Sequence, residues 1–384
     1  MRDAVICAAV RTPVGKRGGG LSGVHAVDLS AHVLNALAER SGIDPAVVED
    51  VFWGCVSQVG EQTFNIGRNA LLAAGWPESV PGTTIDRQCG SSQQAVAFAA
   101  ATVISGQADV VVAGGVESMS RVPMGSAIGD GSAGSALGPR FLERYDGVFP
   151  NQGVGAEMIA ERWGFSRTQL DEFSLASHEK AAKAQADGAF EEEIAPVTTP
   201  DGTVISVDEG IRPGGTLEKL GSLKTPFKED GVISAGNASQ ISDGAAALVV
   251  TTSEKARELG LTPLVRVHTT VVAGSDPVIM LTAPIPATQK VLQRSGLSIQ
   301  DIGIYEVNEA FAPVPMAWLA DIDAPADRLN PLGGAIALGH PLGGSGARIM
   351  TTLIHRMQTT RTRYGLQTMC EGGGMANATI LELL

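Results

Sequence analysis

The chain has little basic charge, few aromatic residues, few cysteines and no long apolar segment. Its 384 residues carry a formal net charge of −13 at pH 7, which argues against a general nucleic-acid surface, so a polyanionic ligand needs a local basic patch. Aromatic residues are only 4% whereas glycines number 47, and we therefore expect a core of closely packed small aliphatic side chains. The longest apolar run, residues 95–104, is about half of the ~20 residues that span a bilayer, so we expect no membrane partner.

The cysteines and histidines show no metal or disulfide pattern. Cys7, Cys55, Cys89 and Cys370 are scattered without a C-x-x-C pair, which disfavours zinc ribbons and disulfide frameworks. Five of the six histidines lie away from other ligand residues, so the sequence predicts no metal site. The N-terminus lacks the order of a signal peptide, and we expect a soluble protein in a reducing compartment, the cytoplasm.

Strand-like and helix-like segments alternate in the first third of the chain, which is typical of an α/β layered fold. Residues 4–10 form a continuous apolar run, which predicts a buried strand of a parallel sheet covered on both faces. Residues 29–40 have helical spacing. The other predicted elements are strands at 51–55, 83–85 and 109–113, the last ending at Gly114-Gly115, and a helix at 93–104.

The amino-acid composition changes between residue 117 and about residue 240. Glycine, serine and proline become frequent and charged helical stretches appear, so we expect an inserted, partly helical lobe there. The C-terminal part repeats the alternation of predicted strands and helices seen at the start of the chain, which suggests two related halves. Its predicted elements are strands at 264–267, 302–307, 366–370 and 375–384, a glycine-rich loop at 333–346 and a helix at 345–357, after a strand at 245–251.

Cys89 lies between a predicted strand and a predicted helix. Its sulfur is therefore expected near a helix N-terminus, where exposed N–H groups and the helix dipole favour a thiolate and lower the thiol pKa. The small neighbours Gly90, Ser91 and Ser92 leave room for a substrate. A buried structural cysteine is the alternative while this segment stands alone.

His340 lies in a loop that carries six glycines between residues 333 and 346. Glycines let a ligand approach the backbone closely, and a histidine there is well placed as the base for a nearby thiol. A phosphate-cradling loop with an incidental histidine is the alternative. It is disfavoured because neither G-x-x-x-x-G-K-[ST] nor G-x-G-x-x-G after a strand is present.

Two further positions at strand ends are candidates. Cys370 precedes Glu371 and three glycines, whose exposed N–H groups would suit an oxyanion hole, although a simple hairpin turn fits as well. Asn308 closes the predicted strand at 302–307, and it could equally be a helix cap.

These segments, in this order, resemble the signatures of the thiolase family. The family has an active cysteine in a C-[GS]-[SG] turn, an N-E-A-F-A segment, a G-G-A-[IL]-A-L-G-H-P-x-G-x-[ST]-G loop and a terminal C-x-G-G-G. Similarity spans almost the whole chain. The matching segments here are residues 89–92, 308–312, 333–346 and 370–374, with family-like stretches at 11–16 and 234–239.

The resemblance implies a role for each chemical residue. Cys89 would be the nucleophile that takes up the acyl group, His340 would activate it, and Cys370 would move the proton at the α-carbon. Asn308 would position a water that forms one oxyanion hole with His340. The backbone amides of Cys89 and Gly372 would form the other oxyanion hole.

The resemblance also places the coenzyme A site in the inserted lobe. Arg212 stands where a CoA-contacting arginine is expected, Ser239 and Ala235 would flank the pantetheine, and Phe311 would contact CoA. Coenzyme A is then a substrate, and no tightly bound cofactor is expected. A local basic cluster in the acidic chain would suit the CoA phosphates, with a solvated charged face as the alternative: Arg212, Lys219, Lys224 and Lys228.

Three positions depart from the family pattern. Ser92 replaces a glycine, which predicts a tighter pocket near the acyl chain, and Leu332 replaces an asparagine, so a loop-supporting hydrogen bond would be lost. Residues 151–153, Asn-Gln-Gly, replace the His-Met-Gly of short-chain biosynthetic members. This last change favours a degradative type that acts on longer or bulkier 3-oxoacyl chains.

The resemblance implies a thiolase-like α/β fold with two related halves in a five-layer α-β-α-β-α arrangement and an inserted loop lobe. The halves would be residues 1–254, with the lobe at about 117–240, and residues 262–384. The implied enzyme is an acetyl-CoA C-acyltransferase of lipid metabolism or β-oxidation, a homodimer or homotetramer acting on acyl-CoA and CoA. A ketoacyl-synthase-type condensing enzyme is disfavoured because such enzymes pair their cysteine with two histidines, or with histidine and asparagine. A non-catalytic acyl-CoA or lipid-binding protein on the same scaffold is the other alternative.

Overall fold

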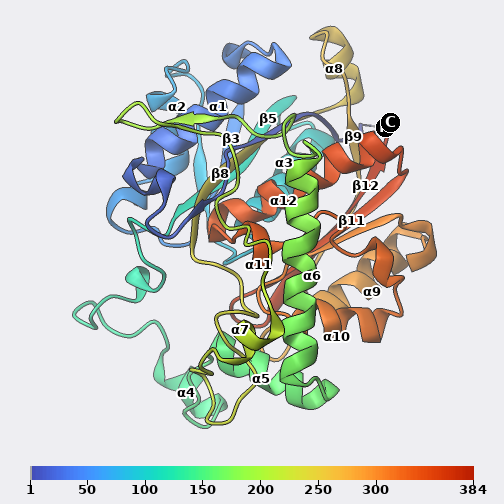
Figure 1. Ribbon diagram of the computed structural model, residues 1–384. Coiled ribbons are helices and arrows are strands. Elements are labelled where there is room, and N and C mark those ends of the chain that lie inside the picture. The colour runs from blue at the N-terminus through green and yellow to red at the C-terminus, as the bar shows by residue number, and fades with distance from the viewer. Residues whose placement is uncertain (1) are drawn as a thin grey trace.

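The computed structural model describes residues 2–384, which form a layered α/β fold (Figure 1). Its main sheet has ten strands in the order β10-β11-β12-β9-β1-β8-β5-β3-β4, with β2 paired to β8. The strands of the N-terminal half are β1 (Val5–Arg11), β2 (Gly15–Lys16), β3 (Asp50–Gly54), β4 (Thr83–Ile85), β5 (Val110–Ser118) and β8 (Ser242–Thr251). Those of the C-terminal half are β9 (Val265–Gly274), β10 (Ile304–Val307), β11 (Tyr364–Glu371) and β12 (Met375–Leu383).

The ten strands form one sheet whose two halves, called here the N-terminal sheet and the C-terminal sheet, are joined by a short pairing. Strand β1 pairs with β9 only at Val5 and Ile6, whereas β1 with β8 and β9 with β12 are paired over longer stretches. The two halves therefore meet at a narrow seam, and helices can lie between them as a central layer.

The helices complete five layers. The central layer is α3 (Ser91–Ser105) and α12 (Leu342–Thr360), which pack against each other and against both sheets. Helices α1 (Ala26–Ser41) and α2 (Ile66–Ala73) cover the outer face of the N-terminal sheet, with the short α8 (Ser253–Glu258) above it. Helices α9 (Pro284–Ser295) and α10 (Pro313–Ile322) cover the outer face of the C-terminal sheet (Figure 1). This arrangement is the five-layer fold that the sequence predicted.

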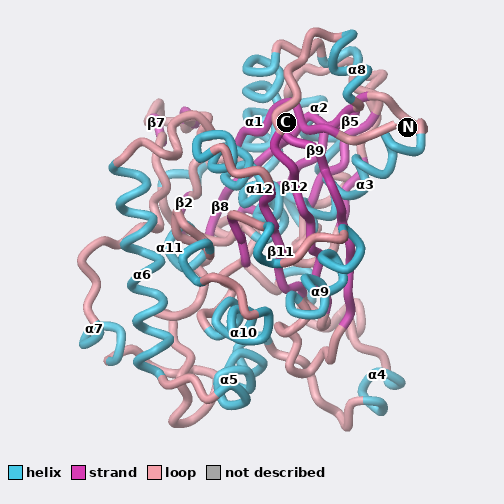
Figure 2. The backbone as a smooth tube through the Cα atoms, turned by 90° about the vertical axis from the view of Figure 1, so that its right-hand side faces the viewer, coloured by secondary structure: helices cyan, strands magenta, loops and turns pink. Residues whose placement is uncertain are grey.

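The lobe leaves the sheet after β5 and returns at β8. It contains α4 (Pro139–Arg144), α5 (Gln152–Trp163), the long α6 (Arg167–Ala186), α7 (Leu217–Gly221) and a small hairpin of β6 (Val197–Thr198) and β7 (Val204–Ile205). Figure 2 shows α5, α6 and α7 gathered on one side of the sheet. The lobe thus lies beside the lower end of the sheet in this view, on the same side as the loops that carry the family-like motifs.

Glycines let α12 approach the neighbouring backbone directly. A Cβ on Gly343 would lie 2.6 Å from Cys55 Cα and from Val116 O, and one on Gly346 would lie 2.3 Å from Gln93 N. Side chains cannot fill this space, because the backbones themselves are in contact. The high glycine count and low aromatic count of the chain are the consequence of this close layering.

Several element predictions need correction. Strand β1 is antiparallel to both β8 and β9, so its fully apolar sequence reflects burial on both faces and not a parallel sheet. Strand β5 runs on through Gly114 and Gly115 to Ser118, because those glycines let Trp53 and the carbonyl of Gly343 pack directly on the strand. The glycine-rich segment is not one loop, since it holds the short helix α11 (Ala335–Leu338) and the first turn of α12.

Candidate active site

The Cys89 turn connects β4 to the central helix α3. Cys89 directly precedes Gly90, the N-cap of α3, so the predicted placement at a helix N-terminus is confirmed. Gln88 adopts a left-handed conformation with φ 49°, and Ser91 closes the turn by accepting from Arg87 N at 2.9 Å and donating to Gln88 O at 2.5 Å. The turn holds the Cys89 side chain at 5% exposure.

Two backbone amides and a second thiol surround the Cys89 sulfur. The sulfur accepts from the N–H groups of Cys89 itself and of Gly372, and Cys370 lies close enough for the two thiols to interact electrostatically. Gly372 lies against the Gln88 side chain, since a Cβ on Gly372 would lie 2.8 Å from Gln88 Oε1. Gly372 to Gly374 also form the tight turn between β11 and β12. The same glycine segment therefore closes the hairpin and supplies the amide donor.

The expected low thiol pKa is wrong. Burial raises the pKa of Cys89 to about 12, and the nearby Glu371 carboxyl adds to this effect, while the two backbone N–H groups oppose it. Burial likewise raises the pKa of Cys370 well above its ordinary value. The resting thiols are therefore neutral, because the helix N-terminus does not compensate for the removal of water.

His340 is buried and held in one orientation by Ser345. The Ser345 hydroxyl donates to Pro341 O at 2.8 Å, so it accepts from His340 Nδ1, 2.6 Å away. This assigns the proton to Nδ1 and leaves Nε2 free to act as a base. Burial, with a smaller contribution from the charge of Arg348, lowers the pKa of His340 to about 3, so the ring is neutral.

Asn308 links the histidine to the end of β11. Its Nδ2 lies 3.4 Å from His340 Nε2. Strands β10 and β11 are parallel with Val307 opposite Thr368, which brings Asn308 to the same sheet edge as Cys370. Asn308 is not a helix cap, since α10 begins at Pro313 with Ala312 as its N-cap.

The loop that carries His340 is supported by buried polar residues. The Glu309 carboxylate accepts from Asn330 Nδ2 at 2.9 Å, Ser177 Oγ at 2.7 Å and Ile336 N at 3.2 Å. Leu332 packs in an apolar cluster with α6. The loop beside Leu332 is thus held by the hydrogen bonds of Asn330 and Glu309.

A chamber of about 250 Å³ leads away from these groups and is called here the inner chamber. His340 lies in its wall, and Met119 and Leu342 of the wall belong to the same apolar cluster as Cys89, so Cys89 lies directly behind this wall. Three of the predicted CoA residues, Ser239, Ala235 and Phe311, line this chamber. The other lining residues are Met124, Gln152, Pro226, Phe227, Ser234, Ala238, Gln240 and Ile241.

A second cavity of about 270 Å³, the outer chamber, adjoins the first, since Ala235 and Gln240 line both. Arg212 and Lys219 lie in its wall. The rest of the predicted basic cluster is not brought there: Lys228 pairs with Glu161 at 3.0 Å, and Lys224 does not line the chamber.

Two lining residues were missed from the sequence. His178, read as structural, lines the outer chamber and accepts from Arg212 N at 3.1 Å. Gln240 joins Arg212 to the catalytic loop, since its amide group contacts Arg212 and donates to Ile336 O and Ala337 O. A histidine on a charged helix and a glutamine before a strand carry no distinctive sequence pattern.

The structure shows where two of the departures from the family pattern lie. The Ser92 hydroxyl accepts from Ala347 N at 2.9 Å and is fully buried between α3 and α12, so it does not narrow the chamber. Asn151 caps α5 by accepting from Gly153 N and Val154 N, whereas Gln152 lines the inner chamber. Of the changed residues at 151–153, Gln152 is therefore the one that can contact a substrate.

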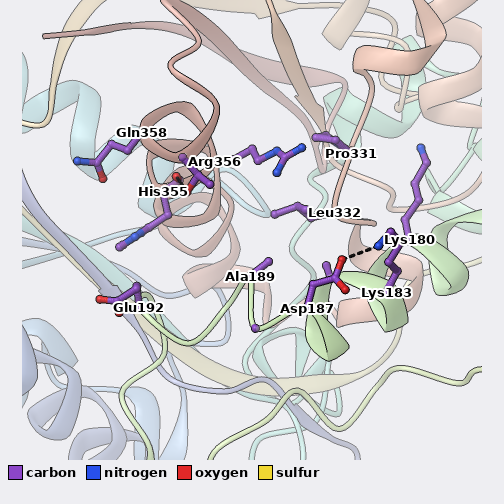
Figure 3. A pocket seen from close by; sticks show the side chains of 13 residues that line it. Lys180, Lys183, Asp187, Ala189, Glu192, Pro331, Leu332, His355, Arg356 and Gln358 are labelled. Carbon is purple, nitrogen blue, oxygen red and sulfur yellow. Dashed lines mark hydrogen bonds and ion pairs between the residues drawn. The ribbon is translucent and has the colours of Figure 1, made fainter.

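A larger cavity lies elsewhere. It has a volume of about 770 Å³ and is formed by the C-terminal ends of α6 and α12, where Lys183 pairs with Asp187 at 2.6 Å (Figure 3). None of Cys89, His340, Cys370 and Asn308 lines it. It is distinct from the site described above.

Among residues 2–384, no cluster of three or more histidine, cysteine or acidic side chains could hold a metal ion. Within the same residues, no helix combines the length and apolar character needed to cross a bilayer.

Comparison with known proteins identifies the chain. Residues 4–254 match the thiolase N-terminal domain, and residues 261–383 match the thiolase C-terminal domain. The chain is 50% identical to the steroid 3-ketoacyl-CoA thiolase FadA6 of Mycobacterium tuberculosis, in an alignment that covers 100% of this chain and 95% of that protein. It is 46% identical to a β-ketoadipyl-CoA thiolase of Escherichia coli, with 100% of both chains covered. The crystal structure of the Bacillus anthracis acetyl-CoA acetyltransferase superposes with a TM-score of 0.92 at 39% identity, covering 100% of this chain and 99% of that one.

The fold and the matches to known proteins together show that the protein is an acyltransferase. The chain belongs to the thiolase family.

Proposed function

We propose that the protein cleaves 3-oxoacyl-CoA with coenzyme A, giving acetyl-CoA and an acyl-CoA shortened by two carbons, or runs the reverse Claisen condensation. The observation that carries the proposal is the convergence of the Cys89 sulfur, two backbone N–H groups and the Cys370 thiol, with Cys89 packed behind the wall of a chamber that His340 lines. The names of the similar proteins, two of them 3-ketoacyl-CoA and β-ketoadipyl-CoA thiolases, support the same reaction.

The first step forms an acyl-enzyme. His340 Nε2 takes the proton of the Cys89 thiol, and the thiolate attacks the C3 carbonyl of the substrate. The C2–C3 bond then breaks, leaving the acyl group on sulfur and the enolate of acetyl-CoA, which takes a proton from Cys370. Splitting the reaction in this way replaces one difficult step by two easier ones.

Two sets of donors stabilise the two charged oxygens. The N–H groups of Cys89 and Gly372 face the sulfur and suit the oxygen of the acyl group. Asn308 Nδ2 and the protonated His340 Nε2 suit the thioester oxygen of the enolate, with a water between them. Removal of one such donor typically costs about 3 kcal/mol of transition-state stabilisation.

Coenzyme A would enter through the outer chamber. Arg212 and Lys219 supply positive charge there for its phosphates, while Ser239, Ala235 and Phe311 flank the pantetheine in the inner chamber. The thiol of the incoming CoA then attacks the acyl-Cys89 and releases the shortened acyl-CoA.

The inner chamber favours longer or bulkier 3-oxoacyl chains. Its far end is lined by Met124, which is 56% exposed, and by Phe227, which is 37% exposed, so a chain leaving Cys89 can extend toward solvent. Flexible methionine side chains adapt to acyl groups of different shape.

The enzyme is proposed to work as an oligomer of identical chains. Strand β4 is the end of the main sheet, and large apolar side chains are exposed on the elements around it. An exposed edge with an apolar surround fits self-pairing across a two-fold axis. These side chains are Phe64, Leu72, Phe98 and Ile104.

Thiolysis of a graded series of 3-oxoacyl-CoA substrates, from short linear to steroid-like, tests the function. Chromatography of the acetyl-CoA formed should show turnover that improves from acetoacetyl-CoA to longer chains, and Cys89→Ser should abolish it. Turnover of no member would contradict the proposed activity. Binding of acyl-CoA without turnover would instead support a non-catalytic binding protein.

A further inference from the structure

Glu371 is a buried carboxyl group that the proposed mechanism does not use. It lies between Cys370 and Gly372 at the end of β11 and is 0% exposed. Neighbouring side chains on a strand leave on opposite faces, so Glu371 lies on the face of β11 opposite Cys370, the face on which Met369 packs with Cys89. The same face is occupied by the first turn of α3.

The Glu371 carboxyl packs directly beneath the nucleophile turn. A Cβ on Gly90 would lie 2.0 Å from Glu371 Oε1 and 2.8 Å from Asn377 Nδ2. Gly90 has φ −84°, which any residue adopts, so the need for glycine comes from this contact and not from the backbone angle. The carboxyl therefore supports the residue that follows Cys89.

The hydrogen bonding at this contact lacks a donor. Both Glu371 oxygens and Asn377 Oδ1 are buried without a partner, while Asn377 Nδ2 donates to Gly90 O at 3.1 Å. A buried carboxylate with no donor is costly, whereas a protonated carboxyl supplies an O–H for a neighbouring acceptor. Consistent with this, burial raises the pKa of Glu371 to about 8 although Arg87 opposes the shift.

We propose that Glu371 is a positioning residue that supports the Cys89–Gly90 turn as a neutral carboxylic acid, and that its ionisation disfavours the Cys89 thiolate. The inference rests on the proposed function, because it concerns the same nucleophile. No proton is transferred between Glu371 and the substrate.

The charged and titratable groups around Glu371 are few. Arg87 and Cys89 face it from the β4–α3 turn, and Cys370 is its neighbour on β11. From β12 it is faced by Met375 and Asn377, which do not titrate. A negative charge on Glu371 raises the pKa of both thiols, whereas the neutral acid does not.

Alkylation of Cys89 by iodoacetamide, followed by peptide mass spectrometry from about pH 6.5 to about pH 9.5, tests the proposal without any substrate. In the native enzyme the logarithm of the rate should rise with pH and then flatten above pH 8, as Glu371 ionises. In Glu371→Gln the flattening should disappear, and the rate near pH 9.5 should exceed the native rate roughly tenfold, equal to one unit of pKa. Glu258→Gln on α8, which removes a remote charge, should follow the native profile.

Superimposable profiles of the native enzyme and Glu371→Gln would overturn the proposal. Should Glu371→Gln not fold, Arg87→Gln provides the test, because loss of the positive charge should move the break to higher pH. A break that stays in place or moves to lower pH in that variant would equally contradict it. Failure of thiolysis with these alkylation profiles intact would count against the proposed function alone.

Discussion

Burial acts on both active-site cysteines in the same direction, against the thiolate. The pKa of Cys89 rises to about 12 and that of His340 falls to about 3, so the neutral thiol–imidazole pair is the resting state. Negative charge then appears on sulfur only during reaction, when the N–H groups of Cys89 and Gly372 stabilise it. The site therefore favours the transition state over a permanently ionised nucleophile.

The Cys370→Ala variant should separate the two half-reactions. Removal of the second thiol leaves Cys89 and its donors in place, so the variant should still form an acyl-enzyme from a saturated acyl-CoA. Proton transfer at the α-carbon should fail, and thiolysis and condensation should fall by at least about 100-fold. Intact-mass detection of the adduct and steady-state rates measure the two effects, and loss of both would reassign the role of this thiol.

At the residue scale, the sequence could predict which residues form the site better than it could predict the surroundings of their side chains. The motif resemblance pointed to Cys89, His340, Cys370 and Asn308. The structure brings all four together where the strands β10 and β11 end. The direction of the thiol pKa shift could not be predicted, because it depends on burial by segments distant in sequence. Gln240 was missed for the same reason, since the partners of its side chain come from two segments distant in sequence, one at Gly210 and Arg212 and one at Ile336.

At the scale of elements, the position of α12 decides the position of His340. The Glu117 carboxylate accepts from Gly343 N at 2.8 Å and from Val56 N and Ser57 N at 3.0 Å, which ties the start of α12 to the end of β3. This contact works only because Gly343 carries no side chain.

The Gly343→Ala variant should displace α12 and with it His340. Its Cβ would meet the backbone of Cys55 and Val116 at 2.6 Å, so the free energy of unfolding in urea should fall by about 1–3 kcal/mol and kcat should fall more than KM changes. Gly221→Ala in α7 is the matched control, since its Cβ meets nothing within 4 Å, and should change stability by less than about 0.5 kcal/mol. Equal behaviour of the two variants would show that the close packing is not required.

Apolar runs in the sequence located the strands but not their partners. Residues 4–10 read correctly as a buried strand, yet β1 is antiparallel to both neighbours, because burial on both faces gives the same apolar pattern in either direction. The glycines of β5 read as a strand end, although they continue the strand against Trp53. Such contacts join segments about sixty positions apart, beyond the reach of local patterns.

At the scale of the whole molecule, the sequence could predict the layers and the lobe. Alternation of strands and helices on both sides of the lobe indicated two halves, and the resemblance implied their five-layer stacking. The outer chamber could be predicted only in part, since the lobe directs Arg212 and Lys219 inward but leaves Lys228 paired with Glu161.

The proposed oligomer makes a prediction at the same scale. Phe98 is 44% exposed beside the sheet edge, so Phe98→Asp should weaken the association, because a charge would be buried at the interface. Light scattering coupled to size-exclusion chromatography should show a shift toward the 39.6 kDa monomer. Val204→Asp, on the 59% exposed Val204 of β7, should leave the mass unchanged. A native enzyme that is already monomeric would contradict the prediction.

Intact-mass spectrometry of the enzyme mixed with a 3-oxoacyl-CoA, without free CoA, tests the central claim most directly. The account predicts release of acetyl-CoA and a mass increase equal to the shortened acyl group, located on Cys89 by peptide mapping and removed by added CoA. Turnover without any adduct on Cys89, or an adduct on another residue, would contradict it.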